Sequence, residues 1–416
     1  MAKTVVRGKP VCIAASVVAL LMVWTLWSSL QWPNFPTMFD VTSTKTSPAA
    51  DLSCTVTAVG GDRSHDPARP TFYDDPKVNY SIGNQVKDWD EKRRNWLKRH
   101  ASFSSGAGDR VFVLTGSQPW PCKNPIGDHL LLRLFKNKVD YCRIHGYDLY
   151  YNNALLQPNM TSYWAKLPIV RATMVAHPES EWIFWVDSDA IFTDMDFKPP
   201  LEKYKDHNLV VDGWPNLIYE NRSWIAVNAG VFLIRNCQWS MDFMEVWAAM
   251  GPNSPEYENW GRILTSTLKD KMYPVSDDQS ALVYLLLKEK DTWGQKIYIE
   301  NQYTLSGYWA GILDSLNNNG DNYRRRHAEV EREYFYGAAM EAQVKDGGHV
   351  ARRPFITHFT GCQPCSGEHP AYTDEDCWGG MEKALNFADN QVLRSYGFVR
   401  PDLRNPSFVE PLPFPA

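Results

Sequence analysis

The amino-acid sequence predicts an α/β fold, an open sheet flanked by helices, behind one N-terminal membrane-spanning helix. The first observation is a twenty-residue run without charge, Val11–Leu30, close to the N-terminus. The second is a regular alternation of strand and helix patterns between Arg110 and Val186. The third is the stretch WIFWVDSDA at Trp182–Ala190, where a buried strand ends on two carboxylates. Sheets of this class bind ligands beyond the carboxyl ends of their strands, which is where these carboxylates are expected.

Composition narrows the classes of partner. The chain has 416 residues, 43 basic and 48 acidic side chains, and a net charge of −5. Because the two signs are interspersed, no basic tract predicts nucleic acid as a partner and no acidic tail predicts a disordered partner segment. The 17 Trp and 20 Tyr suit carbohydrate binding, although most of these rings are expected in the core. The composition therefore excludes nucleic acid and leaves the activity open.

The apolar run Val11–Leu30 has about the length that a helix needs to cross a bilayer. Lys3, Arg7 and Lys9 precede it and the next charge is Asp40, which places the N-terminus in the cytosol. A cleaved signal peptide is the alternative, but its apolar core is usually only ~7–15 residues long. We therefore expect a cytosolic tail at 1–10, a signal anchor at 11–30, a stem at 31–70, a catalytic domain at 71–400 and a Pro-rich tail at 401–416.

Two further features fit a luminal domain. N-glycosylation sequons begin at Asn79, Asn159 and Asn221. Seven cysteines follow the anchor, and an oxidising compartment favours up to three disulfides among the last six, with Cys54 left to link two chains. The pair Cys362–Cys365 could form a zinc or redox motif, but no second such pair accompanies it, so we expect structural disulfides. The last six cysteines are Cys122, Cys142, Cys237, Cys362, Cys365 and Cys377.

The elements follow in chain order. A surface helix at Val86–His100 is expected to pack Trp89 and Trp96. Apolar periodicity then predicts strands at Arg110–Gly116, Tyr147–Asn153 and Glu181–Val186, separated by helices at Gly127–Gly146 and Tyr163–His177. The second half predicts strands at His207–Val211 and Val227–Asn236, helices at Gln238–Met250 and Ser276–Lys290, the latter capped by Ser276, and a solvated helix face at Arg324–Tyr334.

The position of Asp187 and Asp189, on either side of Ser188 at a strand end, strengthens the interpretation that they bind a cation. A calcium EF-hand loop is excluded, because Ile191 and Phe192 stand at the next ligand position and at the turn glycine. A site with few carboxylates and an open coordination shell remains. The oxygens of a nucleotide diphosphate can complete that shell around Mg²⁺ or Mn²⁺.

Two more motifs have a structural and a functional interpretation. The segment FITHFTGCQPC, Phe355–Cys365, delivers His358, either as an ordinary buried histidine or as a metal ligand. If His358 reaches Asp189, one imidazole beside carboxylates favours Mn²⁺. The segment SDDQS, Ser276–Ser280, either caps a helix or places a carboxylate and an amide at a sugar. An anion there would stabilise positive charge on an anomeric carbon.

Together these segments resemble glycosyltransferase family 34, the plant Golgi enzymes of hemicellulose synthesis. The resemblance covers roughly residues 70–400, through YWAKLPIVRATMVAHPESEWIFWVDSDAIFTDM, NLVVDGW and SDDQSALVYLL among others. Within the family, NAGVFLIRNCQWS, RRRHAE and RRPFITHFTGCQPC are most similar to the galactomannan galactosyltransferases. The xyloglucan 6-xylosyltransferases have a lysine where this chain has Gln363.

The resemblance implies a GT-A type fold, in which a Rossmann-like nucleotide half merges with an acceptor half. It implies retaining transfer from a UDP-sugar to O6 of a β-1,4-linked polysaccharide acceptor, with Mn²⁺ as cofactor, by a type II protein of the Golgi membrane. It also implies residue roles. These are Asp187, Asp189 and His358 for the metal, Gly116 and Ser117 for uridine, Ser188 for ribose, Gly361 and Gln363 for the diphosphate, and Asp277, Asp278 and Gln279 for the sugar and acceptor.

Galactose transfer from UDP-galactose to mannose in a β-1,4-mannan is the function that we expect. Xylose transfer from UDP-xylose to a β-1,4-glucan is the nearest alternative. A non-catalytic scaffold in a synthase complex is less favoured, because all three metal ligands are present. A metal-dependent hydrolase or lectin is also less favoured, because the ten histidines form no ligand cluster. A homo- or hetero-oligomer with other polysaccharide-synthesising enzymes stays open.

Overall fold

The computed structural model describes residues 80–104, 106–316, 353–405 and 407–412. Several predictions therefore lie outside the described residues: the anchor at 11–30, the stem at 31–70, Cys54, Asn79 and the helix face at Arg324–Tyr334. Within the described ranges, no helix is long and apolar enough to cross a membrane.

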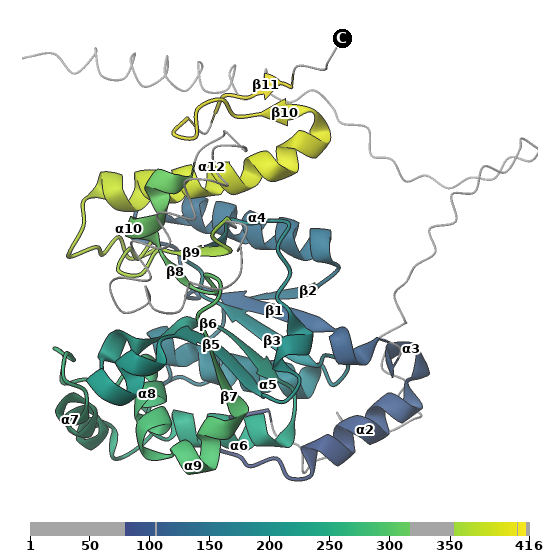
Figure 1. Cartoon of the computed structure of the whole chain (residues 1–416), viewed down its shortest axis with the longest axis vertical. Helices are drawn as coiled ribbons and strands as arrows, with labels where there is room; N and C mark the ends of the chain where they lie inside the picture. The colour runs from purple at the N-terminus through teal and green to yellow at the C-terminus, as the bar shows by residue number, and fades with distance from the viewer. Residues whose placement is uncertain (1–79, 105, 317–352, 406, 413–416) are drawn as a thin grey trace, which may run out of the picture. The chain divides into compact units, whose positions relative to one another are not determined.

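A six-stranded mixed sheet forms the centre, with the strand order β2-β1-β3-β6-β5-β7 (Figure 1). The parallel pairs β2-β1 and β1-β3 confirm the predicted strand–helix alternation. β6 runs antiparallel to both of its neighbours, β3 and β5, whereas β5 and β7 are parallel. The strands are β1 (Val111–Gly116), β2 (Asp148–Asn152), β3 (Trp182–Val186), β5 (Leu209–Gly213), β6 (Val227–Arg235) and β7 (Ile297–Glu300).

Helices cover both faces of this sheet, and each face has its own core. Because side chains alternate along a strand, Ile183 and Trp185 enter one core while Trp182, Phe184 and Val186 enter the other. Figure 1 shows α4 and α12 over one face and α5, α6 and α8 over the other. The long helices are α2 (Trp89–Arg99), α4 (Gly127–His145), α5 (Lys166–Ala176), α6 (Gln238–Ala248), α7 (Tyr257–Thr267), α8 (Asp278–Lys288) and α12 (Gly380–Leu393). The short helices are α3 (Ala101–Ser104), α9 (Lys290–Trp293) and α10 (Trp309–Ile312).

A second, three-stranded sheet joins the end of β3 to the C-terminal region. Its order is β4-β9-β8, with β4 (Ala190–Phe192), β9 (Ile356–His358) and β8 (Gly307–Tyr308). In the antiparallel β4-β9 pair, Ala190 lies opposite His358. This pairing places the residue after Asp189 beside a histidine that is far away in the sequence. In the C-terminal tail, β10 (Phe398–Val399) pairs with β11 (Glu410–Pro411).

Two local predictions need correction. The helix expected at Tyr163–His177 begins with a separate 3₁₀ turn, Ser162–Ala165, before α5 starts. The predicted cap Ser276 is wrong, because Asp277 caps α8 by accepting a hydrogen bond from the Ser280 amide at 2.7 Å. The buried Ser276 hydroxyl instead donates to the Met250 carbonyl at 2.8 Å. Asp is as good a cap as Ser, so sequence alone did not separate the two.

The described part of the chain contains two disulfides, Cys122–Cys365 and Cys362–Cys377. The two cysteines of the CxxC pair therefore bond to different partners, which confirms the structural role expected for them. Among the described cysteines, Cys142 is buried and reduced, and Cys237 is half-buried and reduced.

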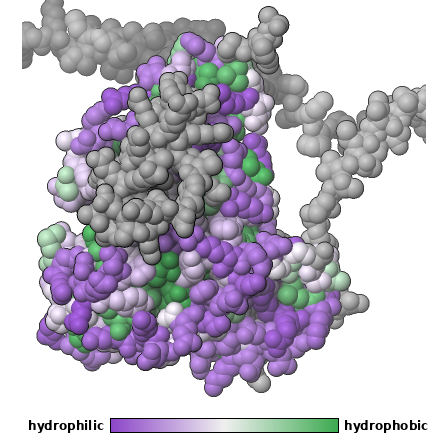
Figure 2. Space-filling model, viewed as in Figure 1, coloured by the Kyte–Doolittle hydropathy of each residue, from purple (hydrophilic) through white to green (hydrophobic). Residues whose placement is uncertain are grey.

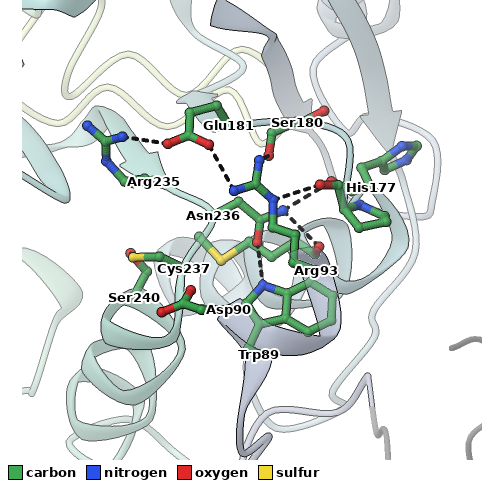
Figure 3. Close-up of polar contacts among 12 residues, drawn as sticks. Trp89, Asp90, Arg93, His177, Ser180, Glu181, Arg235, Asn236, Cys237 and Ser240 are labelled. Atoms are coloured by element: carbon green, nitrogen blue, oxygen red, sulfur yellow. Dashed lines mark hydrogen bonds and ion pairs between the residues drawn. The ribbon is translucent and has the colours of Figure 1, made fainter. Parts of the chain in front are cut away.

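Helix α2 is fixed to the sheet by a polar cluster (Figure 3). The Trp89 indole donates to the Asn236 side chain at 2.7 Å, and Arg93 pairs with Glu181 at 2.8 Å. Glu181 stands just before β3 and also pairs with Arg235 at the end of β6. Trp89 packs into the core, and Trp96 is buried against His100 and Phe103, so both indoles are packed as predicted.

Candidate active site

A solvent-open cavity of about 670 Å³ lies at the carboxyl ends of β1 and β3. Its lining also includes the start of β6, the start of α8 and the segment after β9. All predicted metal, nucleotide and sugar contacts except Asp277 line it: Gly116, Ser117, Asp187, Ser188, Asp189, Asp278, Gln279, His358, Gly361 and Gln363.

The predicted metal ligands form one group. Asp187, Asp189 and His358 each offer a ligand atom, and these atoms lie within 4.8 Å of one another. His358 Nε2 is 3.3 Å from Asp189 Oδ1 and 3.9 Å from Asp187 Oδ2. Strand β3 delivers the aspartates and strand β9 delivers the histidine. Two carboxylates and one imidazole are a donor set that can hold a divalent cation.

Neighbouring residues orient these ligands. The Trp185 indole donates to Asp187 Oδ1 at 2.6 Å, which leaves Oδ2 as the oxygen nearer to His358. On the far side of the imidazole, His358 Nδ1 lies 3.0 Å from the Ser306 hydroxyl. This contact fixes the ring so that Nε2 faces the carboxylates, as outer contacts do for metal-binding histidines.

Gly230 makes room for the group. A Cβ atom at this position would fall inside the contact distance of both His358 Cε1 and Asp187 Oδ2. The Gly230 carbonyl also accepts a hydrogen bond from the Asp187 amide at 2.8 Å. Only glycine therefore fits between the two ligands without displacing one of them.

Lys166 is a site residue that sequence reasoning missed. Its ammonium lies 2.8 Å from Asp278 Oδ2 and 3.4 Å from Asp187 Oδ1, and it donates to the Ala229 carbonyl at 3.0 Å. Burial lowers the pKa of Lys166, but the two carboxylates outweigh that effect and raise it above the ordinary value. Burial raises the pKa of Asp278 to about 6, against the opposing effect of Lys166. The available signal was a lysine at the start of a largely apolar helix.

Lys138 is the second residue that was missed. From α4 its ammonium donates to the carbonyls of Ser188, at 3.1 Å, and Ala190, at 2.7 Å, and so holds the backbone on both sides of Asp189. Burial lowers the pKa of Lys138 to about 8, although Asp189 and Asp187 oppose this shift. Sequence periodicity placed Lys138 in a helix but gave no reason to expect it in the interior.

The remaining predicted residues differ in how firmly they are held. Asp277 caps α8 and pairs with Lys271, so its carboxylate is engaged within the protein. Gln279 accepts from the Ala229 amide at 3.3 Å and donates to the Trp224 carbonyl at 3.2 Å. Gln363 is exposed and accepts from the Ser366 hydroxyl at 2.9 Å.

Gly361, predicted at the diphosphate, and two of the sequon asparagines are also described by the structure. Gly361 is exposed, and its φ of +87° makes the tight turn that was predicted. The sequon asparagines Asn159 and Asn221 are both exposed, as an acceptor of glycan must be.

Residues 107–369 match the model of glycosyltransferase family 34, described as the galactosyl transferase GMA12/MNN10 family. The chain therefore belongs to this family of sugar-transferring enzymes, as its sequence motifs suggested. It is a hexosyl- or pentosyltransferase.

Relatives match over nearly the whole chain. The putative glycosyltransferase 7 of Arabidopsis thaliana is 53% identical over 98% of this chain and 94% of its own. Galactomannan galactosyltransferase 1 of Cyamopsis tetragonoloba is 54% identical over 95% of this chain and 93% of its own. The probable xyloglucan 6-xylosyltransferase 3 of Arabidopsis thaliana is 48% identical over 80% of this chain and 68% of its own. A solved galactosyltransferase, LgtC, is 11% identical over 68% of this chain with a TM-score of 0.31, an overlap too loose to carry a conclusion.

Proposed function

We propose that this protein transfers galactose from UDP-galactose to O6 of mannose in a β-1,4-mannan, with retention of the anomeric configuration. The observation that carries the reaction class is the Asp187, Asp189 and His358 group inside a cavity large enough for a nucleotide-sugar. The observation that favours galactose is the 54% identity to a galactomannan galactosyltransferase over nearly the full chain. Family membership and the mixed sheet support a GT-A type fold.

The chain's own residues would orient and polarise the substrates. Same-face displacement fits retention: the acceptor hydroxyl attacks C1, the bond from C1 to the diphosphate breaks, and a phosphate oxygen of the donor takes the proton. No protein nucleophile is then required. Asp278 lines the cavity, where Lys166 holds it at 2.8 Å, and its carboxylate would stabilise positive charge at C1. Gly116, Ser117 and Ser188 would contact the nucleoside, and Gly361 and Gln363 the diphosphate.

We assign Mn²⁺ as the cofactor, held by Asp187, Asp189 and His358. An imidazole beside two carboxylates favours Mn²⁺ over Mg²⁺. When bound, the ion supplies positive charge that stabilises the departing diphosphate. The open cavity leaves room for donor oxygens to complete its shell.

Asp189→Ala is expected to abolish transfer and to weaken Mn²⁺ binding at least tenfold, because it removes the carboxylate 3.3 Å from His358 Nε2. Retention of one carboxylate and the imidazole should leave the fold intact. Titration calorimetry measures the Mn²⁺ affinity, and a thermal melt shows whether the variant is folded. Full activity in a folded Asp189→Ala protein would contradict the metal assignment.

The substrate assignment is tested with full-length protein in detergent micelles and Mn²⁺. UDP-galactose and UDP-xylose are offered in turn to manno- and cello-oligosaccharides, and the products are identified by mass and by linkage analysis. Galactose at O6 of mannose is the expected product. Xylose on a cello-oligosaccharide would instead establish xyloglucan-type xylosyl transfer, the alternative that the 48% identity to a probable xylosyltransferase supports.

The proposed location is the Golgi membrane, with residues 1–10 cytosolic, 11–30 spanning the bilayer and the catalytic domain in the lumen. The uncharged run at 11–30 and the basic residues before it support this topology. Protease treatment of sealed Golgi vesicles should leave the catalytic domain intact. N-glycans at Asn159 and Asn221 would give the same orientation.

A further inference from the structure

We propose that an exposed apolar surface beside the cavity binds the backbone of the acceptor polysaccharide beyond the reacting sugar unit. The surface, called the platform below, consists of Tyr163, Ile225, Met272, Tyr273 and Val275. This inference rests on the proposed function, because it identifies where that enzyme would hold the rest of its acceptor chain.

The platform residues are unusually exposed for their type. Met272 is 74% exposed, Tyr273 59% and Ile225 58%. Val275 and Tyr163 are also exposed. Figure 2 shows a mostly hydrophilic surface on the face that it displays, with hydrophobic side chains in separate areas. A cluster of apolar side chains on such a protein indicates a binding surface.

The platform is one surface, because the segments that form it are bonded together. The Ser223 hydroxyl and the Trp224 amide both donate to the Asp270 carboxylate. The Lys271 ammonium lies 5.7 Å from the centre of the Trp224 ring. These contacts join the segment that leads into Ile225 to the segment that leads into Met272, so the two residues stand on neighbouring segments.

The platform is continuous with the cavity. Tyr163 itself lines the cavity, as do Asp278 and Gln279. Gln279 donates to the Trp224 carbonyl, directly before Ile225. Tyr257, which interacts with Tyr163, donates its hydroxyl to the Ser276 carbonyl at 3.1 Å, directly after Val275.

The strand order places Ile225 of the platform on the side of β3 away from the proposed nucleoside contacts. β3, which ends just before Asp187 and Asp189, lies between β1 and β6 in the sheet. The proposed nucleoside contacts Gly116 and Ser117 belong to the β1 end, whereas Ile225 lies in the turn that leads into β6. A sugar held at Asp278 would therefore have the nucleotide on one side and the platform on the other.

The charges around the platform favour a neutral ligand. Lys271 and Asp277 form an ion pair in which their side chains are 1% and 15% exposed, and Asp270 is occupied by two hydrogen bonds. The Lys271 and Asp277 charges therefore neutralise each other within the protein, and the Asp270 carboxylate accepts from Ser223 and Trp224. A β-1,4-linked hexose polymer is uncharged and presents C–H groups on its ring faces, which pack well on aromatic and aliphatic side chains. Flat apolar surface with polar groups nearby is what such a ligand needs.

Equilibrium binding without donor tests the platform. Full-length protein in detergent micelles is titrated with β-1,4-mannohexaose, cellohexaose and mannotriose. The variant is Met272→Ser/Tyr273→Ser, and the matched control is Tyr396→Ser, because Tyr396 is 60% exposed but lies in the C-terminal region. We expect the double variant to raise the Kd for the preferred hexaose at least fivefold, and the control to change it less than twofold. The ratio of hexaose to mannotriose affinity should fall in the double variant only.

The outcomes separate this inference from the proposed function. Hexaose binding that depends on the platform, without transfer from either donor, would support the platform and overturn the proposed reaction. Transfer to hexaose with an unchanged Kd in the double variant would support the reaction and overturn the platform. A change of oligomeric mass by light scattering, with the Kd unchanged, would show a contact between copies of the chain and overturn the inference as well.

Discussion

At the scale of single residues, the two carboxylate oxygens of Asp187 have different contacts and different roles in the site. Oδ1 is held by the Trp185 indole and the Lys166 ammonium, and Oδ2 faces His358. Asp187 is therefore fixed on the side away from His358, and His358 is fixed by the Ser306 hydroxyl on the side away from the carboxylates. Such preorganisation lowers the cost of assembling the site around an ion.

Gly230→Ala is expected to break this arrangement. The new methyl group would overlap His358 Cε1 and Asp187 Oδ2, so at least one ligand must move. We expect Mn²⁺ affinity and the transfer rate each to fall at least tenfold, measured by calorimetry and by product formation. Gly108→Ala is the matched control, because a Cβ at Gly108 meets nothing within 4 Å. Unchanged Mn²⁺ affinity in Gly230→Ala would refute the close packing of the group.

Asp212 predicts a pH dependence of stability. It is buried, and burial raises its pKa from an ordinary 3.8 to about 8. The folded state therefore holds the proton more tightly than the unfolded state between these two pH values. Asp212 contributes its full stability below pH ~4 and loses it as the pH rises towards 8, by at most about 1.4 kcal/mol per pH unit.

The measurement is urea unfolding at pH 5, 6.5 and 8, for the unaltered protein and for Asp212→Asn. The amide can still accept the hydrogen bond from the Ser306 backbone. We expect the free energy of unfolding to fall less with pH in the variant, so that the difference between the proteins grows towards pH 8. Parallel pH curves for the two proteins would show that Asp212 does not titrate in this range.

At the scale of elements, the strands next to the site could be predicted and the small sheet could not. β1, β3 and α4 have uninterrupted apolar or helical patterns, and their observed bounds differ from the predicted ones by one residue at an end. β4, β8 and β9 have only two or three residues each, too few for periodicity to appear. Their pairing depends on contacts between segments far apart in sequence, which local pattern does not encode.

The attachment of α2 is also a feature of packing between elements (Figure 3). Asn236 accepts from the Trp89 indole at 2.7 Å and donates to the carbonyls of Met174 and His177, each at 3.0 Å. Asn236→Ala removes all three bonds in a buried place, and we expect it to lower the free energy of unfolding by about 2–4 kcal/mol. Urea unfolding followed by Trp fluorescence measures this change.

The control variant for that measurement changes Cys237, at the edge of the same polar cluster. Cys237→Ser alters a half-buried thiol whose nearest polar contact is the Ser240 hydroxyl, at 3.4 Å. We expect its unfolding free energy to stay within about 1 kcal/mol of the unaltered protein, since it replaces one small side chain by another. Equal loss in the two variants would mean that the Trp89–Asn236 bond contributes nothing specific.

At the scale of the whole molecule, the set of site residues could be predicted because it rested on a family resemblance as well as on local sequence pattern. The rule that ligands bind at strand ends was enough to predict Asp187 and Asp189 as site residues. It did not establish that His358 would lie beside them. The roles of Lys166 and Lys138 could not be predicted from the sequence. A buried cation is recognisable only once the three-dimensional structure places its carboxylate or carbonyl partners around it. Asp277 shows the reverse case, in which a carboxylate predicted to face the sugar serves as a helix cap.

The disulfide Cys122–Cys365 connects the two halves of the chain at the cavity, across 243 residues of sequence. Cys365 and the flanking residues of both cysteines, such as Pro121 and Pro364, line that cavity. The bond therefore holds the loop after β1 against the loop after β9, at the place proposed for the nucleotide.

Cys122→Ser/Cys365→Ser is expected to lower the free energy of unfolding by about 2–5 kcal/mol and to raise the KM for UDP-galactose several-fold. Thermal melts and initial rates measure these effects, and Cys362→Ser/Cys377→Ser, which removes the other disulfide, is the comparison. A larger rise in donor KM in that second variant would contradict a specific role of Cys122–Cys365 in shaping the donor end of the cavity.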